Sequence, residues 1–253
     1  MQTSARLTGG GVYDILLVVG AKEMWGNAKM SKAIQDAKQF NLPEEKLLGD
    51  WIVCIPGFTL EKYRELQNAH LSIISRSCFG GIISNRLALP FRSPFINLHL
   101  SEKDFSRLLL NPRAYMEKDL VFARKDYREY SGFDVATYAC GDISLVMEHY
   151  RDFDEAVTKW NERKKKINWD NLLIATITES PEVLREFDTL PYDKKVCFVP
   201  FKSDLKSAFY IPDTGKGTKW IWHIVHRSVA EMKFYYDPFD MLLYGKKTPL
   251  IEM

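Results

Sequence analysis

The sequence predicts an α/β fold, because short apolar runs alternate with stretches of helical pattern along most of the chain. Several of these helical stretches begin with a recognisable cap and end near proline or glycine. The chain has 253 residues, of which 46% are hydrophobic, so it can bury a core of domain size.

The N-terminal part shows this alternation first. Strands are predicted at 13–19, 50–55 and 71–75, and helices at 29–40 and 59–68. The loop at 19–26 lacks the glycine spacing of a nucleotide-binding loop, so no cofactor is expected there.

Helix caps organise the rest of the chain. Ser101 precedes a helix, Asp152 begins a capping box with Glu155, and Ser180 is followed by proline at the first helical position. Strands are predicted at 95–100, 143–147, 172–177 and 195–201. The aromatic-rich segment 218–245 has no firm assignment.

Composition excludes several classes of protein. The 35 basic and 33 acidic side chains give a net charge of +2, without the basic excess that is typical of nucleic-acid binding. No apolar run approaches the roughly 18–20 residues of a membrane span, although peripheral association with a membrane stays open. The polar start and the four cysteines without a CxxC motif predict a cytoplasmic protein with reduced thiols. The composition does not predict an oligomeric state.

Four side chains follow predicted strands at points where a ligand could bind. Open α/β sheets bind ligands beyond the carboxyl ends of their strands. Cys78, His99, His149 and Glu179 each lie at such an end. If these strands are parallel, all four residues share one edge.

Cys78 has the most specific local sequence, Ser77-Cys78-Phe79-Gly80-Gly81. A thiol on a turn after a strand resembles a nucleophile elbow, in which glycine amides point at a developing oxyanion. A neighbouring histidine could lower the thiol pKa and act as the base. Alternatively, the glycines only make a turn, and Cys78 is a small buried residue.

The histidines and the basic run 163–166 also have two interpretations each. His149 could be a general base or an anion ligand, and His149 and His99 could equally be core residues. His223 and His226 are spaced like a metal pair but have no third ligand, so no metal site is expected. Arg163 and Lys166 share a helical face beside Trp160 and could bind a phosphate or uronic acid, or could simply complement the helix dipole.

The sequence also resembles a bacterial family known as domain of unknown function 1919, over about residues 70–245. The matching motifs are Ile73 to Gly81, Leu89 to Leu98, His149-Tyr150 with Phe153, Glu155-Ala156, Trp160 and Arg163, Ile167-Asn168 with Asp170-Asn171, Phe187, Leu190, Lys195-Val196 and Phe198, and Asp237-Pro238-Phe239-Asp240. The family tends to have asparagine just before the cysteine, where this chain has Arg76-Ser77, and tryptophan after it, where this chain has Phe79.

The resemblance implies a three-layer α/β/α fold with a mixed, mostly parallel sheet. It also implies a role in making exopolysaccharide, capsule or cell-wall glycan, with a sugar or nucleotide-sugar as the small-molecule partner. Residues 71–253 would be the main domain, and residues 1–70 a partial α/β segment similar to a nucleotide-binding unit.

Three functions are consistent with these observations. The first is a transferase with Cys78 as nucleophile and His149 as base, in which Ser77, Gly80, Gly81, His99, Trp160, Arg163, Lys166 and Glu179 bind substrate. The second is a glycosyl- or phosphosugar transferase without a covalent step. The third is a non-catalytic scaffold whose contact surface is the aromatic segment from Trp220 to Tyr244.

Overall fold

The computed structural model describes residues 52, 55–128, 132–150, 152–212, 214, 220–231 and 233–250. The strands are β1 (Ser72–Ser75), β2 (Val121–Arg128), β3 (Phe133–Cys140), β4 (Ile143–Val146), β5 (Leu172–Ile177), β6 (Lys194–Val199) and β7 (Ala208–Tyr210). The helices are α3 (Leu60–Asn68), α4 (Phe79–Arg86), α5 (Glu102–Leu110), α6 (Pro112–Met116), α7 (Phe153–Lys164), α8 (Pro181–Thr189), α9 (Ile221–Ala230) and α10 (Pro238–Tyr244). The elements predicted at 13–19 and 29–40, and most of the strand at 50–55, lie outside the described residues.

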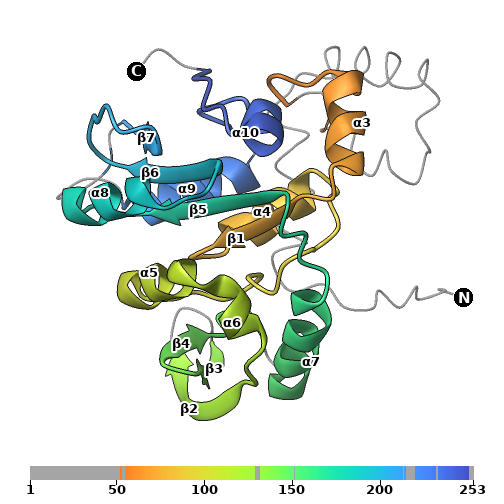
Figure 1. The fold of residues 1–253 in the computed structure, drawn as a ribbon, viewed down its shortest axis with the longest axis vertical. Helices are drawn as coiled ribbons and strands as arrows, with labels where there is room; N and C mark the ends of the chain where they lie inside the picture. Colours follow the sequence, from red (N-terminus) through yellow and green to blue (C-terminus); the bar gives the residue numbers. More distant parts are fainter. Residues whose placement is uncertain are drawn as a thin grey trace, which may run out of the picture.

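A parallel sheet in the order β1-β5-β6-β7 forms the middle layer (Figure 1). Successive side chains of each strand point to opposite faces of this sheet. Ile73 and Leu173 therefore belong to one core, and Ile74 and Ile174 belong to the other. Helices α3, α4, α9 and α10 contribute to the first core, and α5, α7, α8 and the antiparallel sheet β2-β3-β4 to the second. The predicted α/β class is confirmed.

The predicted caps form. The Asp104 amide donates to Ser101 Oγ at 3.1 Å, and the Val183 amide donates to Ser180 Oγ at 3.2 Å. Asp152 Oδ1 accepts from the Glu155 amide at 3.1 Å. These bonds satisfy amides that have no acceptor within the helix, which explains why sequence alone located these starts.

The strand predicted at 95–100 does not form, and this segment is not part of the parallel sheet. His99 makes an isolated antiparallel bridge to Val146, and Asn97 has a positive φ of 61° that interrupts an extended run. Strand β4, predicted correctly as a strand, pairs with β3 and not with β1. His99 and His149 therefore reach the edge of β1 from the antiparallel side of the molecule.

The two glycines after Cys78 lie in the first turn of helix α4 and not in the predicted turn. A Cβ on Gly80 would lie 2.8 Å from Ser75 Oγ, and one on Gly81 would lie 3.2 Å from Ile96 Cγ2. Glycine is needed here because the helix packs closely on β1 and on the segment beside it.

The unassigned C-terminal segment contains α9 and α10, and five of its seven aromatic residues lie in one hydrophobic core or pack against it. Phe234, Tyr236 and Phe239 are at most 5% exposed, whereas Trp220 is 68% and Tyr244 43% exposed. The expected aromatic contact surface is therefore largely core, because these rings cover one face of the parallel sheet.

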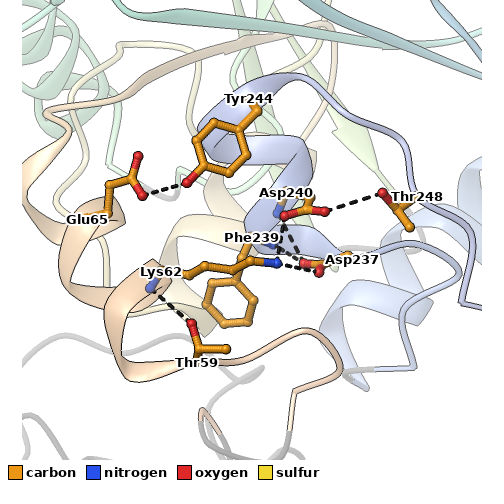
Figure 2. Close-up of polar contacts among 8 residues, drawn as sticks. All are labelled: Thr59, Lys62, Glu65, Asp237, Phe239, Asp240, Tyr244 and Thr248. Carbon is orange, nitrogen blue, oxygen red and sulfur yellow. Dashed lines mark hydrogen bonds and ion pairs between the residues drawn. The ribbon is translucent and has the colours of Figure 1, made fainter.

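Helix α10 is fastened to α3 by an ionic cluster (Figure 2). Lys62 Nζ lies 2.6 Å from Asp240 Oδ1 and 3.0 Å from Asp237 Oδ2, and the Tyr244 hydroxyl donates to Glu65 at 2.5 Å. Asp237 also caps α10 by accepting from the Phe239 amide. Within the described residues, α3 thus shares one core with β1 and α10. Most of the partial domain predicted over 1–70 lies outside the residues that the structure describes.

Candidate functional site

The candidate site lies at the carboxyl end of β1, where the chain passes through Arg76, Ser77 and Cys78 into helix α4. Strand β1 pairs in parallel with β5, so Glu179, which follows β5, lies at the same edge of the sheet. Helix α9 packs over α4 and brings His226 to this edge. A strand end covered by two helices is the position at which α/β proteins commonly bind ligands.

Ser77 and His226 form a polar pair at the site. Ser77 Oγ lies 2.8 Å from His226 Nε2, and Ser77 is only 3% exposed, whereas His226 is partly exposed. Burial, with smaller effects of His149 and His223, lowers the pKa of His226 to about 4. The imidazole is therefore neutral near neutral pH and can accept a proton.

Cys78 has the opposite of an activating environment. Burial, together with the nearby Glu148 carboxylate, raises the pKa of its thiol to about 12. Reactive cysteines have a lowered pKa, supplied by a cation or an unopposed helix N-terminus. The expected thiolate at Cys78 is thus disfavoured, and Cys78 serves as the residue at which α4 begins.

His149 lies beside the Ser77–His226 pair, as its effect on the pKa of His226 shows. Its backbone amide donates to Asn97 O at 3.2 Å, which attaches the end of the antiparallel sheet to the segment beside β1. Burial lowers the pKa of His149. Glu148 raises this pKa by a smaller amount, and His99 lowers it. The predicted His149 is therefore at the site, as a second neutral imidazole.

His99 holds Glu148. His99 Nδ1 lies 2.7 Å from Glu148 Oε1, and the Glu148 side chain is 9% exposed. The backbone of His99 also exchanges hydrogen bonds with Val146 at 2.9 and 3.0 Å. His99 therefore positions the carboxylate that acts on Cys78 and His149.

Four other predicted residues have different placements. Trp160 is 1% exposed and packs edge-to-face on Phe95, so its ring belongs to the core and not to a ligand surface. Glu179 is exposed. The amide of Gly80 donates to Ser75 Oγ at 3.1 Å, which removes it as an oxyanion donor, and Gly81 lies inside α4.

Arg76 organises the floor of the site. Its guanidinium donates to Ile177 O at 2.6 Å, pairs with Glu102 at 3.2 Å and stacks on Trp222 at 4.1 Å. Arg76 is 5% exposed, and burial lowers its pKa to about 10. These contacts join β1, β5, α5 and α9, so they fix the strand end from which Ser77 projects.

A basic pocket lies beside the site and contains the predicted Arg163 and Lys166. The pocket has a volume of about 530 Å³ and is lined by Pro90, Phe91, Arg92, Lys159, Glu162, Arg163 and Lys166. Arg163 Nη1 donates to the Tyr150 hydroxyl at 2.7 Å. Because Tyr150 follows His149 directly, this hydrogen bond connects Arg163 of the pocket to the segment that carries His149.

Sequence reasoning missed the role of His226. Its only sequence signal was the spacing from His223, which suggested a metal pair. His226 contacts Ser77, whereas His223 is exposed. In the described ranges, no three His, Cys, Asp or Glu side chains are grouped to hold a metal ion.

The free thiols in the described part are Cys78, Cys140 and Cys197, and Cys54 lies outside it. Among the described helices, none has the length and apolarity required to cross a bilayer.

Comparison with known proteins identifies the family. The model of the family described as "Domain of unknown function (DUF1919)" matches residues 53–245, which includes α3 and so begins earlier than the expected residue 70. An "Uncharacterized protein" of Haemophilus influenzae is 35% identical over 184 residues, which cover 70% of this chain and 84% of the relative. The match extends from α3 to the end of α10 and takes in the site, the pocket and the ionic cluster, and on this basis the chain belongs to the DUF1919 family.

Proposed function

We propose that the protein is a transferase that passes a group from an activated donor to a hydroxyl of a surface-glycan precursor in one displacement step. His226 is the general base, and Ser77 is the residue that positions it. The observation that carries this proposal is the 2.8 Å contact between Ser77 Oγ and the partly exposed, neutral imidazole of His226. The glycan as acceptor is the substrate class that the family resemblance suggests.

A buried hydroxyl can hold an imidazole in one orientation. When Nε2–H donates to Ser77 Oγ, the lone pair of the neutral ring is on Nδ1, where it can take a proton from a bound hydroxyl. An asparagine carbonyl could accept the same Nε2–H, and the family tends to have asparagine just before the cysteine, where this chain has Arg76-Ser77. A positioning role therefore suits both residues, whereas a nucleophilic role suits only serine.

The environment of Cys78 favours direct displacement over a thioester. With a thiol pKa of about 12, only a very small fraction of Cys78 is ionised near neutral pH. In the proposed step, the acceptor oxygen forms a bond to the donor's electrophilic atom while the bond to the leaving group breaks. The leaving group departs with that electron pair, and His226 takes the acceptor proton.

The test compares Ser77→Ala with Ser77→Asn. Purified protein is incubated with a panel of nucleotide-diphosphate sugars and a sugar acceptor, and release of the nucleoside diphosphate is measured. We expect turnover in the wild type, a loss of about 10–100-fold in Ser77→Ala, and substantial rescue in Ser77→Asn. Thermal unfolding of each variant checks that it is folded.

A covalent mechanism predicts a different pattern. If Ser77 were the nucleophile, both Ser77 variants would be equally inactive. With either Ser77 or Cys78 as nucleophile, intact-mass analysis of the wild type with donor alone would show an adduct at that residue. Either result would overturn the single-step mechanism. Unchanged turnover in Ser77→Ala would overturn the assignment of the base itself.

A further inference from the structure

We infer that the pocket between loop 90–92 and helix α7 binds a phosphate-bearing ligand with more than one negative charge, such as a diphosphate. That this ligand is the donor rests on the function proposed above, but its binding does not. The nearest alternative is a single carboxylate, which the charges in the pocket match poorly.

The charge of the pocket is concentrated and largely unpaired. Arg92, Arg163 and Lys166 form no ion pair with any carboxylate that the structure describes. Lys159 lies 3.9 Å from Glu162, so these two lining side chains compensate each other. Three positive charges therefore remain, in a chain whose total net charge is only +2. One carboxylate would leave two of them unmatched, whereas a diphosphate would neutralise most of them.

Several other arginines in the described part of the chain have carboxylate partners. The pairs are Arg107 with Asp104, Arg124 with Asp126, Arg185 with Glu182 and Arg227 with Glu231. Arg113 and Arg128 also form no ion pair with a described carboxylate, but Arg92 and Arg163 differ from them because they line one concave site. An unpaired cluster of this kind is what an anion site requires before its ligand arrives.

Arg163 is held in place without a counterion. Its Nη1 donates to the Tyr150 hydroxyl at 2.7 Å, and its guanidinium stacks on Phe91 at 5.1 Å from the ring centroid. Tyr150 is 6% exposed, and its hydroxyl donates to Ile96 O at 3.2 Å. Ordering Arg163 in advance reduces the conformational entropy lost when a ligand binds.

The helix dipole does not account for the whole cluster. Basic residues at the C-terminal end of α7 complement the dipole, and Lys164 and Arg163 lie in its last turn. Arg92 comes from the loop after α4, far along the chain from α7, and lines the same pocket. Two separate segments thus supply cations to a pocket of about 530 Å³, a volume typical of sites for small organic ligands.

The pocket is connected to His149 through Tyr150. Arg163 donates to the Tyr150 hydroxyl, and Tyr150 follows His149 directly in the chain. A ligand with its phosphates on Arg163 could therefore extend past Tyr150 towards His149 and His226.

Calorimetric titration with inorganic pyrophosphate tests the pocket without any turnover. We expect saturable binding to the wild type, and binding weakened about tenfold in each of Arg92→Gln, Arg163→Gln and Lys166→Gln. Arg185→Gln, which removes an exposed arginine from α8, is the matched control and should bind like the wild type. Acetate should not compete with pyrophosphate at equal concentration.

Lys166 is exposed, so Lys166→Gln keeps the test valid even if Arg163→Gln unfolds by releasing Tyr150. Equal pyrophosphate affinity in the wild type and Lys166→Gln, or effective competition by acetate, would overturn the inference. His226→Gln should retain pyrophosphate binding. Loss of turnover with retained binding would count against neither proposal, whereas turnover without pyrophosphate binding would contradict the pocket alone. Pyrophosphate binding without turnover of any donor would contradict the function alone.

Discussion

Two regions of the molecule have opposite effects on their ionisable groups. The ionic cluster between α3 and α10 stabilises charged groups, and the imidazole site at the end of β1 stabilises neutral ones. In the ionic cluster, Lys62 is charged and lies between Asp237 and Asp240 (Figure 2). At the imidazole site, His226 is neutral, and its close polar partner is the hydroxyl of Ser77. Matched charges hold two helices together, whereas a neutral imidazole beside a hydroxyl keeps its capacity to take a proton.

The pKa shifts record this difference. The hydrogen bond from Lys62 lowers the pKa of Asp240, and the one to Asp240 raises the pKa of Lys62, so both charged forms are stabilised. Burial lowers the pKa of His226, so its charged form is destabilised. A site that disfavours its own charged state is a better candidate for proton transfer than one that is already neutralised.

The largest expected effect is on turnover. His226→Gln should reduce donor turnover by about 10²–10⁴-fold, because it removes the general base while leaving a side chain that can bond Ser77. His223→Gln is the matched control, since His223 lies on the same helix but is exposed. Steady-state turnover rates of both variants test this prediction. Equal losses of turnover in the two variants would contradict the assignment of His226 as the general base.

The next effect is on the ionic cluster. Lys62→Met should lower the free energy of unfolding by about 2 kcal/mol, because it leaves two neighbouring carboxylates without their cation at a partly buried position. Lys62→Arg should recover most of this loss. Urea denaturation measures both variants, and a Lys62→Met protein as stable as the wild type would show that the cluster contributes no stability.

Acid titration should separate the two regions. His226 has a lowered pKa, so the unfolded chain binds its proton first, and stability falls as the pH drops from about 6.5 to about 4. Because His226 is partly exposed, we expect a loss of roughly 2 kcal/mol in this window. The Asp240 pKa is also lowered, but that stability is lost only as the pH falls below its ordinary value of 3.8.

Denaturation at a series of pH values measures these windows. His226→Gln should reduce the slope between pH 6.5 and 4 and leave the loss at lower pH in place, while His149, whose pKa is also lowered, keeps part of the slope in the upper window. An unchanged slope in His226→Gln would mean that another group accounts for the upper window.

The smallest expected effect is at Cys78. Cys78→Ala should change donor turnover by less than about threefold, because a thiol with a raised pKa supplies no nucleophile. A loss comparable to that of His226→Gln would instead support the covalent route through Cys78.

Much of the fold was predictable from local sequence. The helix starts at Ser101, Asp152 and Ser180, and the strands at 72–75, 143–146 and 172–177, follow from caps and short apolar runs. Strand β2 was not predictable in this way, because most of its side chains are exposed and it lacks apolar alternation. Helix α4 was not predicted, because its first turn contains two glycines, which disfavour a helix. These positions require glycine because the helix packs closely on Ser75 and Ile96.

Part of the candidate site was also visible in the sequence. Ser77, His149, Arg163 and Lys166 were identified from their positions at strand ends and on one helix face, and the structure brings them to adjoining sites. Trp160 fitted the same helix-face argument, but its ring is buried. Periodicity shows that residues share a face, and it does not show whether that face meets solvent or core.

The sequence by itself determined the α/β class, the strand ends at which polar residues gather and the basic character of the end of α7. These features depend on local interactions, in caps, turns and apolar periodicity, that each segment carries wherever it is placed. Only the tertiary structure decided that His226, 149 residues along the chain from Ser77, is its partner. It also decided that Arg92 joins Arg163 in one pocket and that Cys78 is held as a thiol. These outcomes depend on burial and on distances between remote segments, and no local pattern encodes either one.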